Sequence, residues 1–191
     1  MCYKQNSLMK VAVILLLTLL AITTTGSCAE DFVITKITPA FLPTPMTTGD
    51  KQRRGNGDDQ WLAVEVDYRA NAELTDEITF NYFIAMGGKI LSGEVTYVNI
   101  EKSRELHSVM YINPRALKRE AKAKRVSLNA IENIAVQIMN KGAVVAQRSI
   151  REGRGEWWKA EAVKGEVLKK NQTPFCWSDY DYYEEMKPEV H

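Results

Sequence analysis

The sequence predicts an all-β protein, an antiparallel β-sandwich with one short helical connection. Three observations support this fold class. Six or seven short runs alternate apolar and polar residues, as half-buried strands do. Turn-forming residues separate these runs, and the chain lacks the alternation of strands with long helices that a parallel sheet requires.

The clearest element is a β-hairpin over residues 77–100, in which Gly87-Gly88 forms the turn. Paired glycines supply the positive φ angles that two-residue hairpin turns need. Residues placed symmetrically about this turn face one another and share one apolar face. The expected pairs are Ile84 with Leu91, Phe80 with Val95, Ile78 with Tyr97, and Tyr82 with Gly93. The pattern therefore predicts one buried face, with Phe80 and Tyr82 in the core.

Residues 1–29 have the pattern of a secretory signal peptide. Lys4 and Lys10 precede an apolar run over 11–22, and Ser27 and Ala29 are the small residues that a signal peptidase needs. This pattern predicts a mature chain that begins at Glu30 and is exported to the periplasm, the outer membrane or the cell surface. The alternative is a bacterial lipoprotein in which Cys28 is retained and acylated.

Charge and cysteine content narrow the function classes. The formal net charge is +1, and removal of residues 1–29, which carry two lysines and no acid, changes it to −1. A nearly neutral chain lacks the overall positive field of a nucleic-acid-binding protein, so no nucleic acid partner is expected. Cys176 has no partner for a disulfide once Cys2 and Cys28 are removed with the leader.

Strands are expected on both sides of the central hairpin. The β-branched run 32–38 should end at Pro39, because three prolines over 39–45 disfavour a paired strand. Residues 62–69 and 106–112 alternate in the way of half-buried strands. His107 falls on the less apolar face of the second strand, which favours a surface histidine over a catalytic one.

Asn113-Pro114 predicts the start of a short helix over 115–125, because Asn caps helices and Pro suits the first helical position. This helix carries a basic patch whose only acid is Glu120. Its members are Arg115, Lys118, Arg119, Lys122, Lys124 and Arg125. The patch is interpreted either as a solvated helix face or as a contact for an acidic polymer or a lipid surface.

A second hairpin is expected over 134–150, with Asn140-Lys-Gly142 as a three-residue loop that pairs Ile138 with Val144. A register with a two-residue turn fits this hairpin nearly as well. Val163, Val167 and Leu168 predict a last strand or a short helix. The sandwich is thus expected to span residues 30–170.

Residues 171–191 form a C-terminal segment in which aromatic residues alternate with acids. A solvated tail would carry few aromatic residues, so this segment is expected to dock on the sandwich or on a partner. Phe175 and Trp177 are expected to pack on the domain. The residues expected to bind a protein partner at the cell envelope are Trp177, Tyr180, Tyr182 and Tyr183. The alternative is that the whole segment packs on the sandwich as a closing strap and binds no partner.

The leader, the strand pattern and the ending Thr173-Pro-Phe-Cys-Trp-Ser-Asp-Tyr180 together resemble secreted immunoglobulin-like proteins associated with type IV pilus-like systems of gut bacteria. The resemblance spans residues 30–191. It implies an immunoglobulin-like sandwich with a binding or assembly role at the cell surface, without catalytic residues or cofactors. The leader differs from that of a pilin, which favours an accessory subunit over a subunit of the filament shaft.

Two other functions are weighed against this non-catalytic binding module. One is a lipid-anchored structural protein of the envelope, which depends on acylation of Cys28. The other is a carbohydrate-active hydrolase, with paired carboxylates drawn from Asp179, Asp181, Glu184 and Glu185. Such a pair needs a cleft and one carboxyl group with a raised pKa, which a C-terminal tail is not expected to supply.

Overall fold

The computed structural model describes residues 30–45, 60–153, 155–179 and 182–188. The predicted signal peptide over 1–29 lies outside these residues. Seven strands and one α-helix are present in the described part. They are β1 (Phe32–Pro43), β2 (Gln60–Met86), β3 (Lys89–Ile112), α2 (Pro114–Glu120), β4 (Ile131–Asn140), β5 (Ala143–Ser149), β6 (Ala162–Lys164) and β7 (Val167–Lys169). Within this part of the chain, no helix has the length and apolar character needed to cross a membrane.

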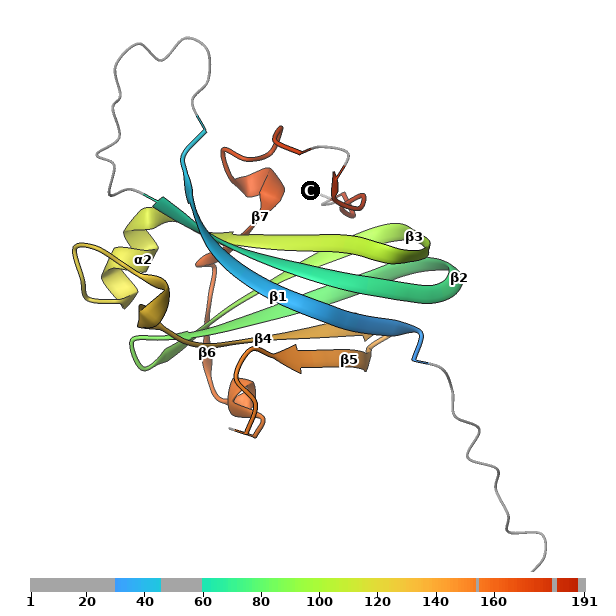
Figure 1. The fold of residues 1–191 in the computed structure, drawn as a ribbon, viewed down its shortest axis with the longest axis horizontal. Coiled ribbons are helices and arrows are strands. Elements are labelled where there is room, and N and C mark those ends of the chain that lie inside the picture. The colour runs from blue at the N-terminus through green and yellow to red at the C-terminus, as the bar shows by residue number, and fades with distance from the viewer. Residues whose placement is uncertain (1–29, 46–59, 154, 180–181, 189–191) are drawn as a thin grey trace, which may run out of the picture.

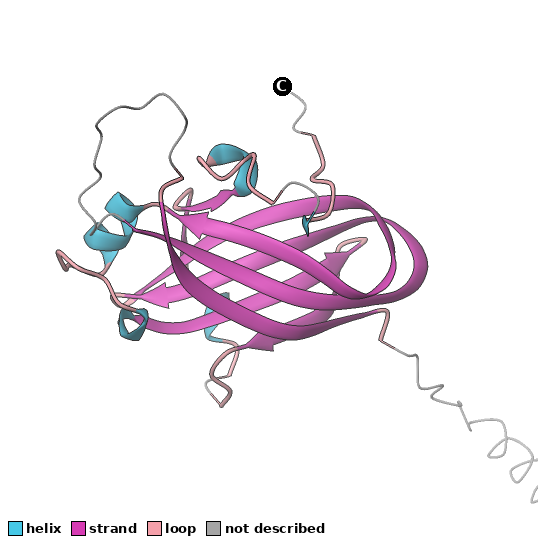
Figure 2. Ribbon diagram, turned by 45° about the horizontal axis from the view of Figure 1, so that its top comes forward, coloured by secondary structure: helices cyan, strands magenta, loops and turns pink. Residues whose placement is uncertain are grey.

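The fold is built on the long hairpin of β2 and β3, which doubles back on itself (Figures 1 and 2). The first half of β2 and the last half of β3 form one layer with β1 and β7. The second half of β2 and the first half of β3 form the other layer, in the order β5-β4-β2-β3-β6. The pairs are antiparallel apart from β3 with β6. The predicted all-β antiparallel sandwich with one helix is confirmed.

The predicted register about Gly87-Gly88 is also confirmed. Ile84 faces Leu91, Phe80 faces Val95, Ile78 faces Tyr97 and Tyr82 faces Gly93. Further from the turn, two bulges between Tyr68 and Leu74 shift the pairing by one residue. These bulges lie where the hairpin bends from one layer to the other, which is a common role of β-bulges.

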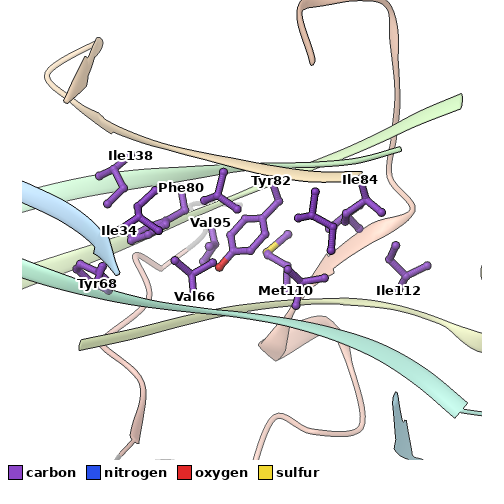
Figure 3. Packing of buried hydrophobic residues seen from close by; sticks show 14 of the residues in the cluster. Ile34, Val66, Tyr68, Phe80, Tyr82, Ile84, Val95, Met110, Ile112 and Ile138 are labelled. Carbon is purple, nitrogen blue, oxygen red and sulfur yellow. The ribbon is translucent and has the colours of Figure 1, made fainter. Parts of the chain in front are cut away.

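The core fills the space between the two layers (Figure 3). Phe80 and Tyr82 are fully buried, as predicted. The Tyr82 hydroxyl donates to Ser108 Oγ at 2.7 Å, and Ser108 Oγ lies 3.1 Å from the Tyr97 hydroxyl, to which it donates. Because Tyr82 and Tyr97 belong to one layer and Ser108 to the other, this buried hydrogen-bond chain joins the layers through the core.

Both edges of the sandwich are closed by polar or main-chain contacts. On one edge, Arg148 of β5 donates to the main-chain oxygens of Ile34 and Thr35 in β1, at 3.0 and 2.6 Å. On the other edge, β6 pairs with the start of β3 and β7 pairs with its end, so residues 162–169 connect the two layers. Exposed strand edges are thereby reduced on both sides.

The strand expected to end at Pro39 continues to Pro43, so that prediction is wrong. Pro39 lies opposite Val64 within the β1–β2 pair. The reason is that β1 pairs only with β2 in the described sheet. An edge strand tolerates proline because the missing N–H faces away from the ladder.

The expected three-residue loop of the second hairpin is wrong, and the hairpin has the two-residue turn that was its alternative. Lys141 and Gly142 have φ angles of 50° and 80°, as a type I′ turn requires. Asn140 therefore pairs with Ala143, and a bulge then sets Ile138 opposite Ala146.

The helix α2 begins as predicted, because the Asn113 side chain accepts from the Ala116 N–H at 2.8 Å. It ends at Glu120 instead of Arg125.

Candidate functional site

Most of the described C-terminal segment lies across the outside of the layer that contains β1 and β7. We call its described residues, 170–179 and 182–188, the C-terminal strap. Beneath it, β2 and β3 present an outer face, formed by the side chains that point away from the core. These are Ala63, Glu65, Asp67, His107, Val109 and Tyr111.

The strap is anchored at its first half by Phe175, which is 6% exposed. Its ring stacks on that of Tyr111, with centroids 4.8 Å apart and planes 5° apart, and meets Trp61 edge-on at 5.7 Å. The hydroxyl of Thr173 accepts from the Phe175 N–H and donates to the Lys170 carbonyl. Phe175 therefore docks on the sandwich, as predicted.

A second anchor lies over His107. The ring of Tyr182 stacks on the imidazole with centroids 4.0 Å apart, and its hydroxyl donates to Glu65 Oε1 at 3.2 Å. Burial and the charge of Glu65 raise the pKa of Tyr182 to about 12, so its hydroxyl keeps its proton at neutral pH. Tyr183 packs edge-on against Tyr182, and Lys170 Nζ lies 4.6 Å from the centre of the Tyr183 ring.

The end of the strap extends the sheet along the free edge of β3. The Val98 N–H donates to the Glu185 carbonyl at 2.9 Å, and the Lys187 N–H donates to the Thr96 carbonyl at 2.8 Å. Met186 thus lies opposite Tyr97 as a β-bridge. This pairing satisfies main-chain groups that a bare edge would leave to solvent.

Under the strap, Glu65, Asp67 and His107 form a compact cluster. Glu65 and Asp67 are two apart on β2 and so share a face, and His107 lies opposite Asp67 on β3. His107 Nδ1 is 3.1 Å from Asp67 Oδ1 and 3.6 Å from Glu65 Oε1. The histidine side chain is 10% exposed, whereas the two carboxylates are about one-third exposed. His107 was predicted to lie on the sheet surface, and it does face outward, but Tyr182 covers it.

Glu184 adds a further carboxyl group near this cluster. Its pKa is raised by burial and by the charge of Glu101, while the charge of His107 acts in the opposite direction. The neighbouring Glu185 side chain instead lies 3.4 Å from the amide of Asn99. A raised carboxyl pKa is one property that a hydrolase pair needs.

Glu184 and Glu185, the adjacent described members of the candidate set, are not arranged as a hydrolase pair. Adjacent residues in an extended segment point to opposite sides, and Glu184 and Glu185 have different partners. Asp179 is exposed, with its main-chain carbonyl bonded to Lys170 Nζ. Asp181 lies outside the described residues.

The structure distinguishes among the predicted partner-binding residues. Trp177 is 84% exposed, so the prediction that it packs on the domain is wrong. Hydrogen-bonded turns from Thr173 to Cys176 and from Phe175 to Ser178 hold the backbone while Phe175 points inward. Tyr182 is half-exposed and Tyr183 is half-buried, both within the strap. Tyr180 lies outside the described residues.

The residues of the basic patch differ in their surroundings. Arg119 Nε lies 2.7 Å from Glu120, and its Nη2 lies 2.6 Å from Glu166, so this side chain fastens α2 to the segment before β7. Arg115, Lys122, Lys124 and Arg125 are exposed and Lys118 is half-buried. The structure thus places Arg119 in a contact within the domain. Binding of the patch to an acidic polymer or a lipid surface stays a prediction.

Comparison with known proteins identifies the family. A protein-family model matches residues 24–190, which is most of the chain. The chain belongs to the family that this model defines. A search of curated proteins finds no match.

The fold of this family member resembles that of a solved protein from Akkermansia muciniphila. That crystal structure is 21% identical in sequence, with a TM-score of 0.69, over 83% of this chain and 93% of the other. Two Bacteroides uniformis β-glucuronidase structures, one with cyclophellitol-6-carboxylate aziridine bound covalently, are 5% identical and have TM-scores of 0.36 and 0.34. They align with 62% of this chain but only 14% of theirs.

The Glu65–Asp67–His107 cluster was not predicted from the sequence. The alternation over 62–69 does place Glu65 and Asp67 on one face. Their approach to His107, however, depends on the one-residue shift between β2 and β3. The turn residues Gly87 and Gly88 give no indication of that change in register.

Proposed function

We propose that this chain is a non-catalytic, exported binding or assembly module at the bacterial cell surface, accessory to a type IV pilus-like system. Three observations support the proposal. The chain belongs to the family matched over residues 24–190. It has the all-β sandwich fold, and its leader and ending resemble those of secreted proteins associated with such systems.

The proposed binding role is based on the exposure of Trp177. At 84%, it is the most exposed of the large apolar side chains in the described residues. Its backbone is nevertheless held, because Phe175 two residues earlier is anchored on Tyr111 and Trp61. An indole presented on a fixed backbone loses little conformational entropy on binding, and tryptophan is enriched among residues that dominate protein interfaces. The proposed partner is a protein of the cell envelope that covers Trp177.

A photo-crosslinking residue at position 177 tests this proposal in the native envelope. The matched control is the same residue at position 74, because Leu74 is also a strongly exposed apolar residue, at 62%, and lies at the bend of β2 instead of on the strap. The expected result is a discrete crosslinked envelope protein from position 177 and none from position 74. Equal products at both positions, or none at either, would refute the role of Trp177.

Intact mass measured on protein from the same envelope tests the route of export. A chain that begins at Glu30 agrees with a cleaved secretory leader. A chain that begins at Cys28 with added acyl mass would replace this proposal with a lipid-anchored structural protein.

A further inference from the structure

We propose that Glu65, Asp67 and His107 form a binding site for one divalent transition-metal ion of the Zn²⁺ class. The three side chains come from neighbouring strands of the outer face. Each offers one ligand atom, and the three atoms lie within 4.8 Å of one another. The site is separate from Trp177 and does not depend on the proposed partner.

The distances between the ligand atoms fit a single ion. Protein ligands lie about 2.0 to 2.2 Å from Zn²⁺, so in tetrahedral or octahedral geometry neighbouring ligand atoms are about 2.8 to 3.6 Å apart. His107 Nδ1 lies 3.1 Å from Asp67 Oδ1 and 3.6 Å from Glu65 Oε1. Both distances fall within this range, and all three ligand atoms lie within 4.8 Å of one another.

The charges of the cluster also favour a cation. Among the described residues, His107 is the only basic side chain paired with Glu65 or Asp67. The surroundings add a further acid, since the half-buried Glu184 lies close enough to His107 to feel its charge. Two carboxylates with no lysine or arginine partner gain from a bound divalent ion.

The strands hold this arrangement rigidly. Asp67 and His107 are cross-strand neighbours within the continuous β2–β3 ladder, on the opposite face from the buried residues Val66 and Ser108. Tyr182 lies flat on the imidazole and bonds to Glu65, which limits the access of water to the ligand atoms. Ligands fixed on strands lose less entropy on coordination than ligands on loops.

The types of ligand atom in the cluster favour some metal ions over others. Imidazole nitrogen with two carboxylate oxygens suits Zn²⁺ and similar first-row ions. Mg²⁺ retains most of its water and Ca²⁺ requires six to eight oxygen ligands, so neither fits a site that contributes three protein ligands with one nitrogen.

Titration of the tag-free mature chain with Zn²⁺, followed by calorimetry, tests the site. The expected stoichiometry is one ion per chain, with no displacement by excess Mg²⁺. His107→Gln, Asp67→Asn and Glu65→Gln should each weaken binding at least about tenfold, by comparison with losses measured when supporting groups of metal sites are removed. Displacement of Zn²⁺ by Mg²⁺, or an unchanged affinity in His107→Gln, would overturn the proposal.

Two matched controls separate this site from other acids and from the second histidine. The sequence contains two histidines, and the other is His191. His191→Ala and Glu94→Gln, an exposed acid elsewhere on β3, should retain full affinity. Loss of binding in His191→Ala would overturn the proposed site.

A measurement on the unmodified chain covers the case in which a variant fails to fold. Long-range ¹H–¹⁵N correlation of the histidine rings reports which nitrogen binds the ion. Zn²⁺ should shift the Nδ1 resonance of the buried histidine in step with the calorimetric stoichiometry. A His107 ring that does not respond to Zn²⁺ would overturn the site, whatever the crosslinking at position 177 shows.

Discussion

A Cβ atom placed on Gly87 would lie 2.1 Å from the main-chain oxygen of Glu120. The turn of the central hairpin therefore packs directly against the C-terminal end of α2. Gly88 instead contacts β4, because its N–H donates to Glu132 Oε1 at 3.0 Å. The glycine pair thus serves both the hairpin and the docking of the helix.

Gly87→Ala should be far more destabilising than Gly88→Ala. Both glycines have positive φ, at 60° and 77°. Alanine at either position should therefore lose about 1 to 2 kcal/mol of stability, because the left-handed conformation is unfavourable for it. Only the alanine at 87 also collides with the backbone of α2, since the space around Gly88 is open. Urea denaturation of both variants measures the difference. Equal midpoints would mean that the turn does not touch α2.

Glu120 should make the stability of the protein sensitive to acid. Lys89 Nζ at 2.9 Å and Arg119 Nε at 2.7 Å bind its carboxylate and lower its pKa below the ordinary 4.5. The stabilisation is complete above the unfolded-state pKa of 4.5 and is lost as the pH falls through the lower folded-state value.

Glu120→Gln should therefore lower the melting temperature at pH 7. The difference in melting temperature between wild type and variant should then shrink as the pH falls below 4.5. Thermal melts from pH 7 to pH 3 measure this effect. Glu94→Gln, which removes an exposed acid on β3, is the control and should leave the profile unchanged. A constant gap between Glu120→Gln and wild type at every pH would rule out the ion pairs as the cause.

Phe80→Ala should cost about 3 to 5 kcal/mol of unfolding free energy. Phe80 is fully buried and its ring contacts those of Tyr68, Tyr82 and Tyr97, with centroids 4.9 to 6.4 Å apart. The matched control is Phe83→Ala, because Phe83 lies on the same strand but is only half-buried. A chemical denaturation series should show the smaller loss at Phe83, and the reverse order would contradict the assigned inner face.

Tyr182→Ala should loosen the end of the C-terminal strap. The stack on His107 is worth about 0.5 to 1.5 kcal/mol beyond area burial, so its loss favours opening of the neighbouring bridge. Hydrogen exchange at the Val98 amide, which bonds to Glu185, reports that opening. Tyr182→Phe keeps the ring and removes only the bond to Glu65, so it should exchange more slowly than Tyr182→Ala. Unchanged protection in Tyr182→Ala would show that the stack does not hold the strap.

Local chemistry made part of the fold predictable. Gly87-Gly88 determines a hairpin because its turn needs positive φ at two adjacent positions, and the register near the turn then follows from symmetry. Asn113-Pro114 marks the start of α2 for an equally local reason. The prolines after Thr38 were misleading, because their effect depends on whether β1 has one neighbour or two, and a single segment does not contain that information.

The candidate site depends on distant relationships that the sequence does not reveal. Extended from the turn, the hairpin register would place Asp67 opposite Ser108, whereas the bulges near Tyr68 place it opposite His107. The strap is similar, since the inward direction of Phe175 and the outward direction of Trp177 follow from contacts with Tyr111 and Trp61. Composition indicated that aromatic residues would dock there, but not which of them would.

The bend of β2 and β3 from one layer to the other has a consequence for how the two sheets can separate. Both layers contain β2 and β3, so the two layers are joined through these strands as well as through the core. The bend of the β2–β3 hairpin, at the bulges between Tyr68 and Leu74, makes the two sheets one continuous ribbon, and sliding of one sheet over the other is resisted by covalent backbone.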